Sequence, residues 1–83
     1  MMDNTTQRPL SVIARDIRKH WPKVNFAAVP YLDAMGSLIN ITEMYGSDSA
    51  KSIVLYFLGN ATTWRGPEAK RIKAELNAML KGK

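Results

Sequence analysis

The sequence predicts an all-α fold, a compact bundle of about four short helices with a central, apolar third helix. Apolar residues recur at spacings of three and four through most of the chain. Proline and glycine stand where these runs stop, and 83 residues leave room for one modest core. We therefore expect a flexible, polar N-terminal arm at residues 1–7 and a single helical domain at residues 8–83.

The first helix is expected to start at Pro9 and to stop before Pro22. Proline suits the first turn of a helix because its φ is fixed and it lacks an N–H, whereas it pushes the residue before it out of the helical region. The inward positions are Leu10, Ile13, Ala14, Ile17 and Trp21. Four basic residues share the outward side: Arg8, Arg15, Arg18 and Lys19.

A second helix is expected from Pro30 to about Met44, ended by Gly46. Its inward stripe is Tyr31, Leu32, Met35, Leu38 and Ile39. Gly36 is a poor helix former, so we interpret it as a point where a neighbouring helix approaches closely.

The third helix is expected to be capped by Ser47 or Asp48. The run Ile53 to Leu58 is rich in strand formers, but helical spacing continues beyond it and predicts a helix. The residues at that spacing are Ala50, Ile53, Val54, Phe57, Leu58, Ala61 and Trp64. Because Leu55 and Tyr56 point to the other sides, this helix is apolar nearly all round and should lie centrally.

Small residues at Ser52, Gly59 and Thr63 indicate a ridge where another helix approaches the third one. Leucine at Gly59 should then obstruct helix packing.

The last helix is expected to follow Gly66 and to begin at Pro67, with Glu68 in its first turn, where a negative charge is favoured. Its inward residues are Ala69, Ile72, Leu76, Met79 and Leu80. The outward residues are mostly basic: Lys70, Arg71, Lys73, Asn77 and Lys81. We expect fraying at Gly82.

The composition speaks against catalysis and against a metal or other cofactor. The chain has no cysteine and one histidine, which removes cysteine-based zinc sites and histidine clusters. No close pair of carboxylates and no phosphate-binding glycine loop is present in the sequence, and His20 stands beside Lys19 in a basic stretch. We therefore expect a non-enzymatic protein and assign no catalytic residue.

The sequence also predicts a cytoplasmic protein without a membrane partner. Its first residues lack the charged start and apolar centre of a signal peptide, and no run approaches the ~18 apolar residues of a membrane span.

Protein binding is the function that the sequence favours. Aromatic residues and arginine often anchor interfaces, and Leu55 and Tyr56 lie off the main apolar stripe. With Trp64 and Arg65 they form the expected contact surface of a small accessory or regulatory factor. The partner is an unidentified protein or a second copy of the chain, as a homodimer.

Nucleic-acid binding is the alternative. The chain carries twelve Lys and Arg against seven Asp and Glu, a net charge of +5. Six cations on the first and last helices are the candidates for phosphate contacts: Arg15, Arg18, Lys19, Lys70, Arg71 and Lys73. They form one patch only if the fold brings the two helices side by side.

The segments YGSDSAKSIVLYFL and NATTWRGPEAKRIKAEL resemble, in general style, small uncharacterised accessory proteins encoded by bacteriophages and other mobile elements. The resemblance covers residues 45–76. It implies a compact protein that acts by binding a host or phage macromolecule, and it assigns a role to no individual residue.

Overall fold

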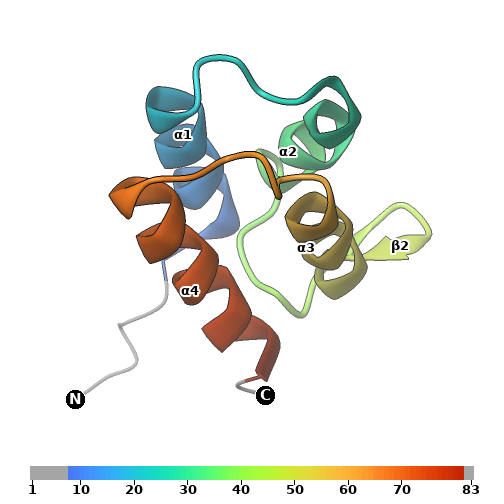
Figure 1. Cartoon of the computed structure of the whole chain (residues 1–83). Coiled ribbons are helices and arrows are strands. Elements are labelled where there is room, and N and C mark those ends of the chain that lie inside the picture. Colours follow the sequence, from blue (N-terminus) through green and yellow to red (C-terminus); the bar gives the residue numbers. More distant parts are fainter. Residues whose placement is uncertain (1–7, 82–83) are drawn as a thin grey trace.

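The computed structural model describes residues 8–81, and this range contains four α-helices and a small hairpin (Figure 1). The elements in order are α1 (Leu10–His20), the 3-10 helix η2 (Phe26–Ala28), α2 (Val29–Met35), β1 (Met44–Tyr45), β2 (Asp48–Ser49), α3 (Ala50–Gly59) and α4 (Pro67–Lys81). The predicted fold class is therefore confirmed. The predicted arm at residues 1–7 and the fraying at Gly82 lie outside the described residues.

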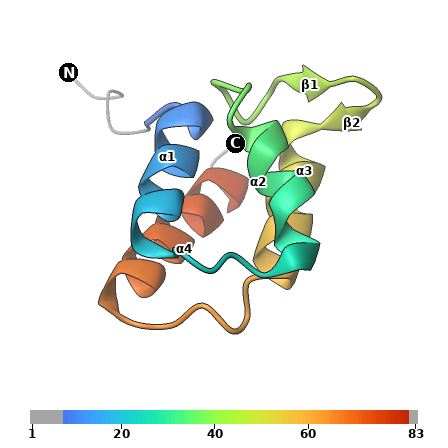
Figure 2. The same cartoon turned by 90° about the horizontal axis from the view of Figure 1, so that it is seen from above.

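The helices form two pairs that face each other. Helices α1 and α4 lie side by side on one side of the molecule, and α2 and α3 lie together on the other (Figures 1 and 2). The hairpin projects beyond the N-terminal end of α3. None of the helices within residues 8–81 is long and apolar enough to cross a membrane.

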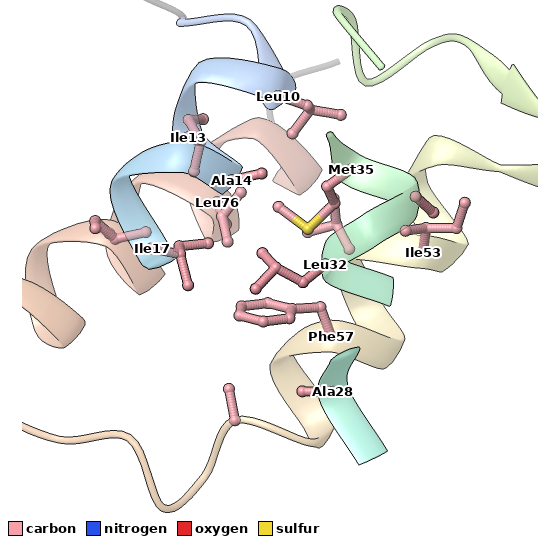
Figure 3. Packing of buried hydrophobic residues seen from close by; sticks show 14 of the residues in the cluster. Leu10, Ile13, Ala14, Ile17, Ala28, Leu32, Met35, Ile53, Phe57 and Leu76 are labelled. Carbon is pink, nitrogen blue, oxygen red and sulfur yellow. The ribbon is translucent and has the colours of Figure 1, made fainter. Parts of the chain in front are cut away.

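The core fills the space between the two pairs (Figure 3). Its largest fully buried side chains come from all four helices: Phe57, Leu10, Ile13, Ile17, Leu32, Met35, Ile72, Leu76 and Val54. Across residues 8–81 no polar or charged residue is buried. The hydrophobic effect therefore holds the pairs together, and polar groups act at the edges.

The start of α1 is fixed by a distant part of the chain. The N–H groups of Leu10 and Ser11 donate to the carbonyl oxygens of Ile39 and Leu38, over 2.9 and 2.8 Å. These N–H groups have no partner inside their own helix. The loop after α2 thus closes the end of α1.

The predicted second helix is wrong in length, since α2 ends at Met35 rather than near Met44. Gly36 terminates it and lies exposed, and a Cβ there would meet only main-chain carbonyl oxygens of its own helix, the nearest being that of Asp33 at 3.2 Å. No neighbouring helix among the described residues approaches it. The following loop buries Leu38 but leaves Ile39 54% exposed, against the prediction.

The hairpin was not predicted. Met44 pairs with Ser49 and Tyr45 with Asp48, around Gly46, whose φ of 62° is typical of tight hairpin turns. Gly46 therefore turns a hairpin instead of ending a helix.

The predicted cap of α3 at Ser47 or Asp48 is also wrong, because both belong to the hairpin. The cap is Ser49, whose hydroxyl oxygen accepts a hydrogen bond from the Ser52 N–H at 3.1 Å.

The strand-like run Ile53 to Leu58 is helical, as predicted, but α3 stops at Gly59 and does not continue to Trp64. It is not covered all round, since Leu55 and Tyr56 are 56% and 55% exposed. The predicted ridge of small residues is wrong. Gly59 is exposed, and no atom lies within 4 Å of a Cβ built there, so Gly59→Leu should not obstruct packing.

The α3–α4 turn follows the prediction, because α4 begins at Pro67 with Glu68 in its first turn. Gly66 precedes it with a φ of 113°.

Two glycines should respond in opposite directions to alanine. Gly66→Ala is expected to lower the free energy of unfolding by about 1–2 kcal/mol, because a Cβ strains a positive φ. Gly59→Ala should raise it by about 0.5 kcal/mol, because alanine favours the helix and its Cβ meets open space. Urea denaturation measures both, and a loss of stability in Gly59→Ala would contradict the exposed position of that residue.

Candidate functional site

Three surface regions bring together residues with chemical potential. An ion network joins α1 to α4; its members are Arg8, Asp16, His20, Glu68, Arg71 and Glu75. A tyrosine groove lies between α2, the hairpin and α3; its lining is Pro30, Tyr31, Ala34, Tyr45, Asp48, Ile53 and Tyr56. A corner pocket lies at the turn into α4; its lining is Trp64, Arg65, Gly66, Pro67, Ala69, Lys70 and Lys73.

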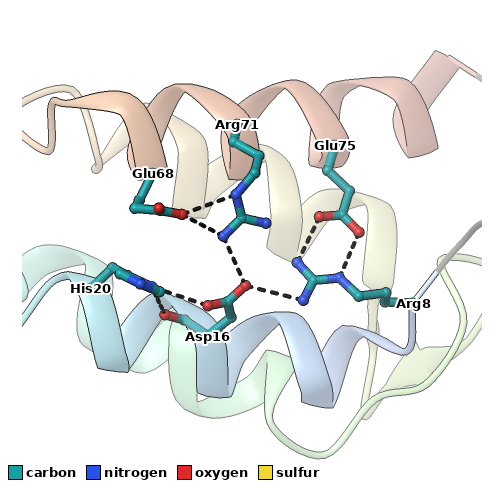
Figure 4. A network of polar contacts seen from close by, with 6 residues as sticks. All are labelled: Arg8, Asp16, His20, Glu68, Arg71 and Glu75. Atoms are coloured by element: carbon teal, nitrogen blue, oxygen red, sulfur yellow. Dashed lines mark hydrogen bonds and ion pairs between the residues drawn. The ribbon is translucent and has the colours of Figure 1, made fainter.

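The ion network is centred on Asp16 (Figure 4). Arg8 makes two hydrogen bonds to Glu75, at 2.9 and 2.7 Å, and a third to Asp16 at 3.0 Å. Arg71 bridges Glu68 at 2.6 Å and Asp16 at 3.2 Å. Arg8, just before α1, pairs with Glu75, whereas Asp16, further along α1, pairs with Arg71, which comes earlier in α4. The helices α1 and α4 are therefore antiparallel.

His20 lies at the edge of the network. Its Nδ1 is 3.0 Å from a carboxylate oxygen of Asp16 and 3.1 Å from the Asp16 carbonyl oxygen. The ring therefore stands beside a carboxylate that two arginines already occupy.

The hydrogen bonds of the network stabilise the charged forms of Asp16 and Arg8. Burial disfavours the charged form of Asp16, but hydrogen bonds from Arg8 and Arg71 outweigh it and lower the pKa of the carboxyl. Hydrogen bonding to Glu75 raises the pKa of Arg8, against the effect of burial. Asp16 and Arg8 thus keep their charges around neutral pH.

Asp16→Asn should lower the free energy of unfolding at neutral pH by about 1–2 kcal/mol, because two charge-assisted hydrogen bonds weaken. The pKa of Asp16 is lower in the folded chain than the ordinary value of 3.8. Its stabilising effect is therefore complete above that value and is lost as the pH falls through the lower, folded pKa. Chemical denaturation between about pH 7 and pH 2 measures this loss.

The matched control for this measurement is Asp48→Asn, an exposed aspartate on the hairpin, which should change stability by less than about 0.5 kcal/mol. An Asp16→Asn deficit that persists undiminished at the acid end would contradict the ion network.

The tyrosine groove combines three rings from three different elements. Tyr31 on α2 and Tyr56 on α3 contact each other, with ring centroids 5.4 Å apart and planes tilted by 36°. Tyr45 extends from the hairpin and is 45% exposed. Asp48, on the facing strand, is the acidic residue of the lining, and the cavity has a volume of about 570 Å³.

The predicted protein-binding residues do not meet at one place. Tyr56 lines the tyrosine groove, and its neighbour Leu55 is exposed on the same helix. Trp64 is 4% exposed, since its ring stacks on that of Trp21, with ring centroids 5.3 Å apart and ring planes inclined by 6°. Arg65 lines the corner pocket.

The predicted nucleic-acid-binding cations are also dispersed. Arg18 pairs with Asp33 of α2, and Arg71 pairs with Glu68 and Asp16. Lys73 donates to the carbonyl oxygen of Trp64 at 2.7 Å.

Three of these cations are exposed and, within residues 8–81, belong to no ion pair: Arg15, Lys19 and Lys70. Although α1 and α4 are side by side, Arg18 of α1 is directed toward α2, whereas Arg71 of α4 is directed toward α1. No described group of three or more His, Cys, Asp or Glu residues is placed to hold a metal ion.

Sequence reasoning did not place Tyr31, Tyr45 and Asp48 beside Tyr56 in the candidate surface. Tyr31 reads as one position of a buried stripe. A two-residue turn at Gly46 and Ser47 was the available signal for the hairpin, because glycine with polar neighbours is common in such turns. That turn is what brings Tyr45 and Asp48 to the groove.

No protein-family model, curated protein or solved structure matches the chain.

Proposed function

We propose that this chain is a small, non-enzymatic protein-binding module, and that its tyrosine groove takes an arginine or lysine side chain from an extended segment of a partner protein. The observation that carries the proposal is the lining of the groove. Three tyrosines and one aspartate surround it, and no basic residue from the described part of the chain contributes.

The chemistry of this lining suits a cation. Aromatic faces attract ammonium and guanidinium groups through the ring quadrupole, and the Asp48 carboxylate is able to accept hydrogen bonds from a guanidinium. The chain as a whole carries a net charge of +5. A groove lined by aromatic rings and one aspartate on a basic protein therefore provides local charge complementarity to a cation.

The groove is large enough to take an anchoring side chain together with neighbouring groups of the partner segment. The volume of about 570 Å³ is in the range of ligand pockets. The contact between Tyr31 and Tyr56 fixes two of the rings before binding, and tyrosine loses little conformational entropy when it is held. Tyr45 on the hairpin forms the more exposed wall.

A different protein is the better occupant than a second copy of the chain. Two copies that each carry a charge of +5 repel at a distance. The arrangement would suit an accessory protein of a bacteriophage or another mobile element, the group that the sequence resembles.

Binding of an arginine peptide tests the proposal. The probe is the blocked peptide acetyl-Ala-Pro-Arg-Pro-Ala-amide, and the matched control carries neutral citrulline in place of arginine. We expect saturable shifts of the Tyr31, Tyr45 and Tyr56 ring signals in NMR spectra. Citrulline should weaken binding about fivefold or more, because the cation–π and carboxylate contacts are lost.

Variants then locate the site. Asp48→Asn and Tyr45→Ala should each weaken binding of the arginine peptide. Leu55→Ala should leave binding unchanged, because Leu55 is an exposed apolar residue of α3 outside the lining. Equal binding of both peptides would overturn the proposal. So would tyrosine signals that shift with protein concentration alone, since a second copy would then occupy the groove.

A further inference from the structure

The corner pocket gathers positive charge that the ion network does not neutralise. Its cavity of about 540 Å³ is lined by three cations, Arg65, Lys70 and Lys73, and by no acidic residue of the described chain. Glu68 is close in sequence, but its carboxylate accepts two hydrogen bonds from Arg71, at 2.9 and 2.6 Å. Glu68 is thereby directed toward α1 (Figure 4), and it does not line the pocket.

Lys73 is held in place at the pocket wall. Its Nζ donates to the carbonyl oxygen of Trp64 at 2.7 Å and lies 6.0 Å from the centre of the Trp64 ring. An ammonium group has three N–H donors, so two remain for a ligand. Because Trp64 is stacked on Trp21, this donor is positioned by buried, rigid groups.

The positive charges act on one another. Burial lowers the pKa of Lys73, and the positive charge of Arg65 lowers it further. An anion in the pocket would reverse the second effect and stabilise the charged ammonium. The pocket also lies at the N-terminal end of the fifteen-residue helix α4, where the helix dipole favours negative charge.

We propose that the corner pocket binds a small phosphate-bearing molecule through Arg65, Lys70 and Lys73. Three cations around one cavity match a phosphate group, which carries about two negative charges and several acceptor oxygens, better than a single carboxylate. The site is a cavity at one turn and not a continuous track. The exposed cations of α1, Arg15 and Lys19, do not line it, which favours a small molecule over a nucleic-acid strand.

Phosphate titration at constant ionic strength tests the site on the full chain. Inorganic phosphate and glycerol phosphate are the probes, chloride and acetate replace them in control titrations, and the amide signals of Gly66, Lys70 and Lys73 are followed by NMR. We expect saturable shifts with both phosphates. Chloride and acetate should bind much more weakly than phosphate, as judged from the same amide signals.

Charge-matched variants separate a site from general attraction. Lys70→Gln should lower the affinity for phosphate about fivefold. Lys73→Gln should lower it about tenfold, because the Lys73 donor is fixed and partly desolvated. Lys19→Gln removes the same charge from α1 and should leave affinity within about twofold. Since Lys73 also contacts Trp64, the exposed Lys70 provides the test that does not depend on folding.

Several results would overturn the proposal: no saturable shift, equal binding of acetate, or the same loss in Lys19→Gln as in Lys70→Gln. A single-stranded oligonucleotide that binds more tightly than glycerol phosphate and also shifts Arg15 and Lys19 would assign the surface to nucleic acid instead. Tyr45→Ala should leave phosphate binding unchanged, so this test is independent of the tyrosine groove.

Discussion

The stacking of Trp21 on Trp64 joins the end of α1 to the turn before α4, two parts of the chain that are distant in sequence. Trp21 ends α1, and Trp64 lies in the turn that leads to α4. Phe57 from α3 packs on Trp21 in a T-shaped arrangement, with ring centroids 6.2 Å apart and ring planes at 71°. Offset and edge-to-face aromatic pairs add to the free energy gained by burial alone. The same contact fixes the carbonyl group that holds Lys73, so the core and the corner pocket depend on it together.

Much of the fold followed from apolar spacing and from proline and glycine positions. These signals are local, and they placed α1, α3 and α4 close to their observed positions. They failed where a distant segment supplies the hydrogen bonds. The carbonyl groups of Leu38 and Ile39 bond to the start of α1, a long-range arrangement that replaces the helix expected there and that periodicity does not reveal.

The surface was harder to predict than the core, because its chemistry depends on pairs of residues from different elements. Helical spacing placed Leu55 and Tyr56 off the main apolar stripe, but it predicted a central helix and not their exposure. The burial of Trp64 depends on Trp21, and the pairing of Arg71 depends on Asp16 across two helices. A list of basic residues therefore overstated the charge that is free to meet a ligand.

The hairpin and the start of α3 are linked through the main chain. The Ala50 N–H donates to the carbonyl oxygen of Glu43 at 2.8 Å, so a main-chain bond links the first residue of the helix to the residue before β1. Opening the hairpin requires this bond to break and frees the first turn of the helix. The hairpin segment that carries Tyr45 and the first turn of α3 are therefore expected to unfold locally together. Any molecule held against Tyr45 would slow amide hydrogen exchange at Ala50, beyond its own footprint.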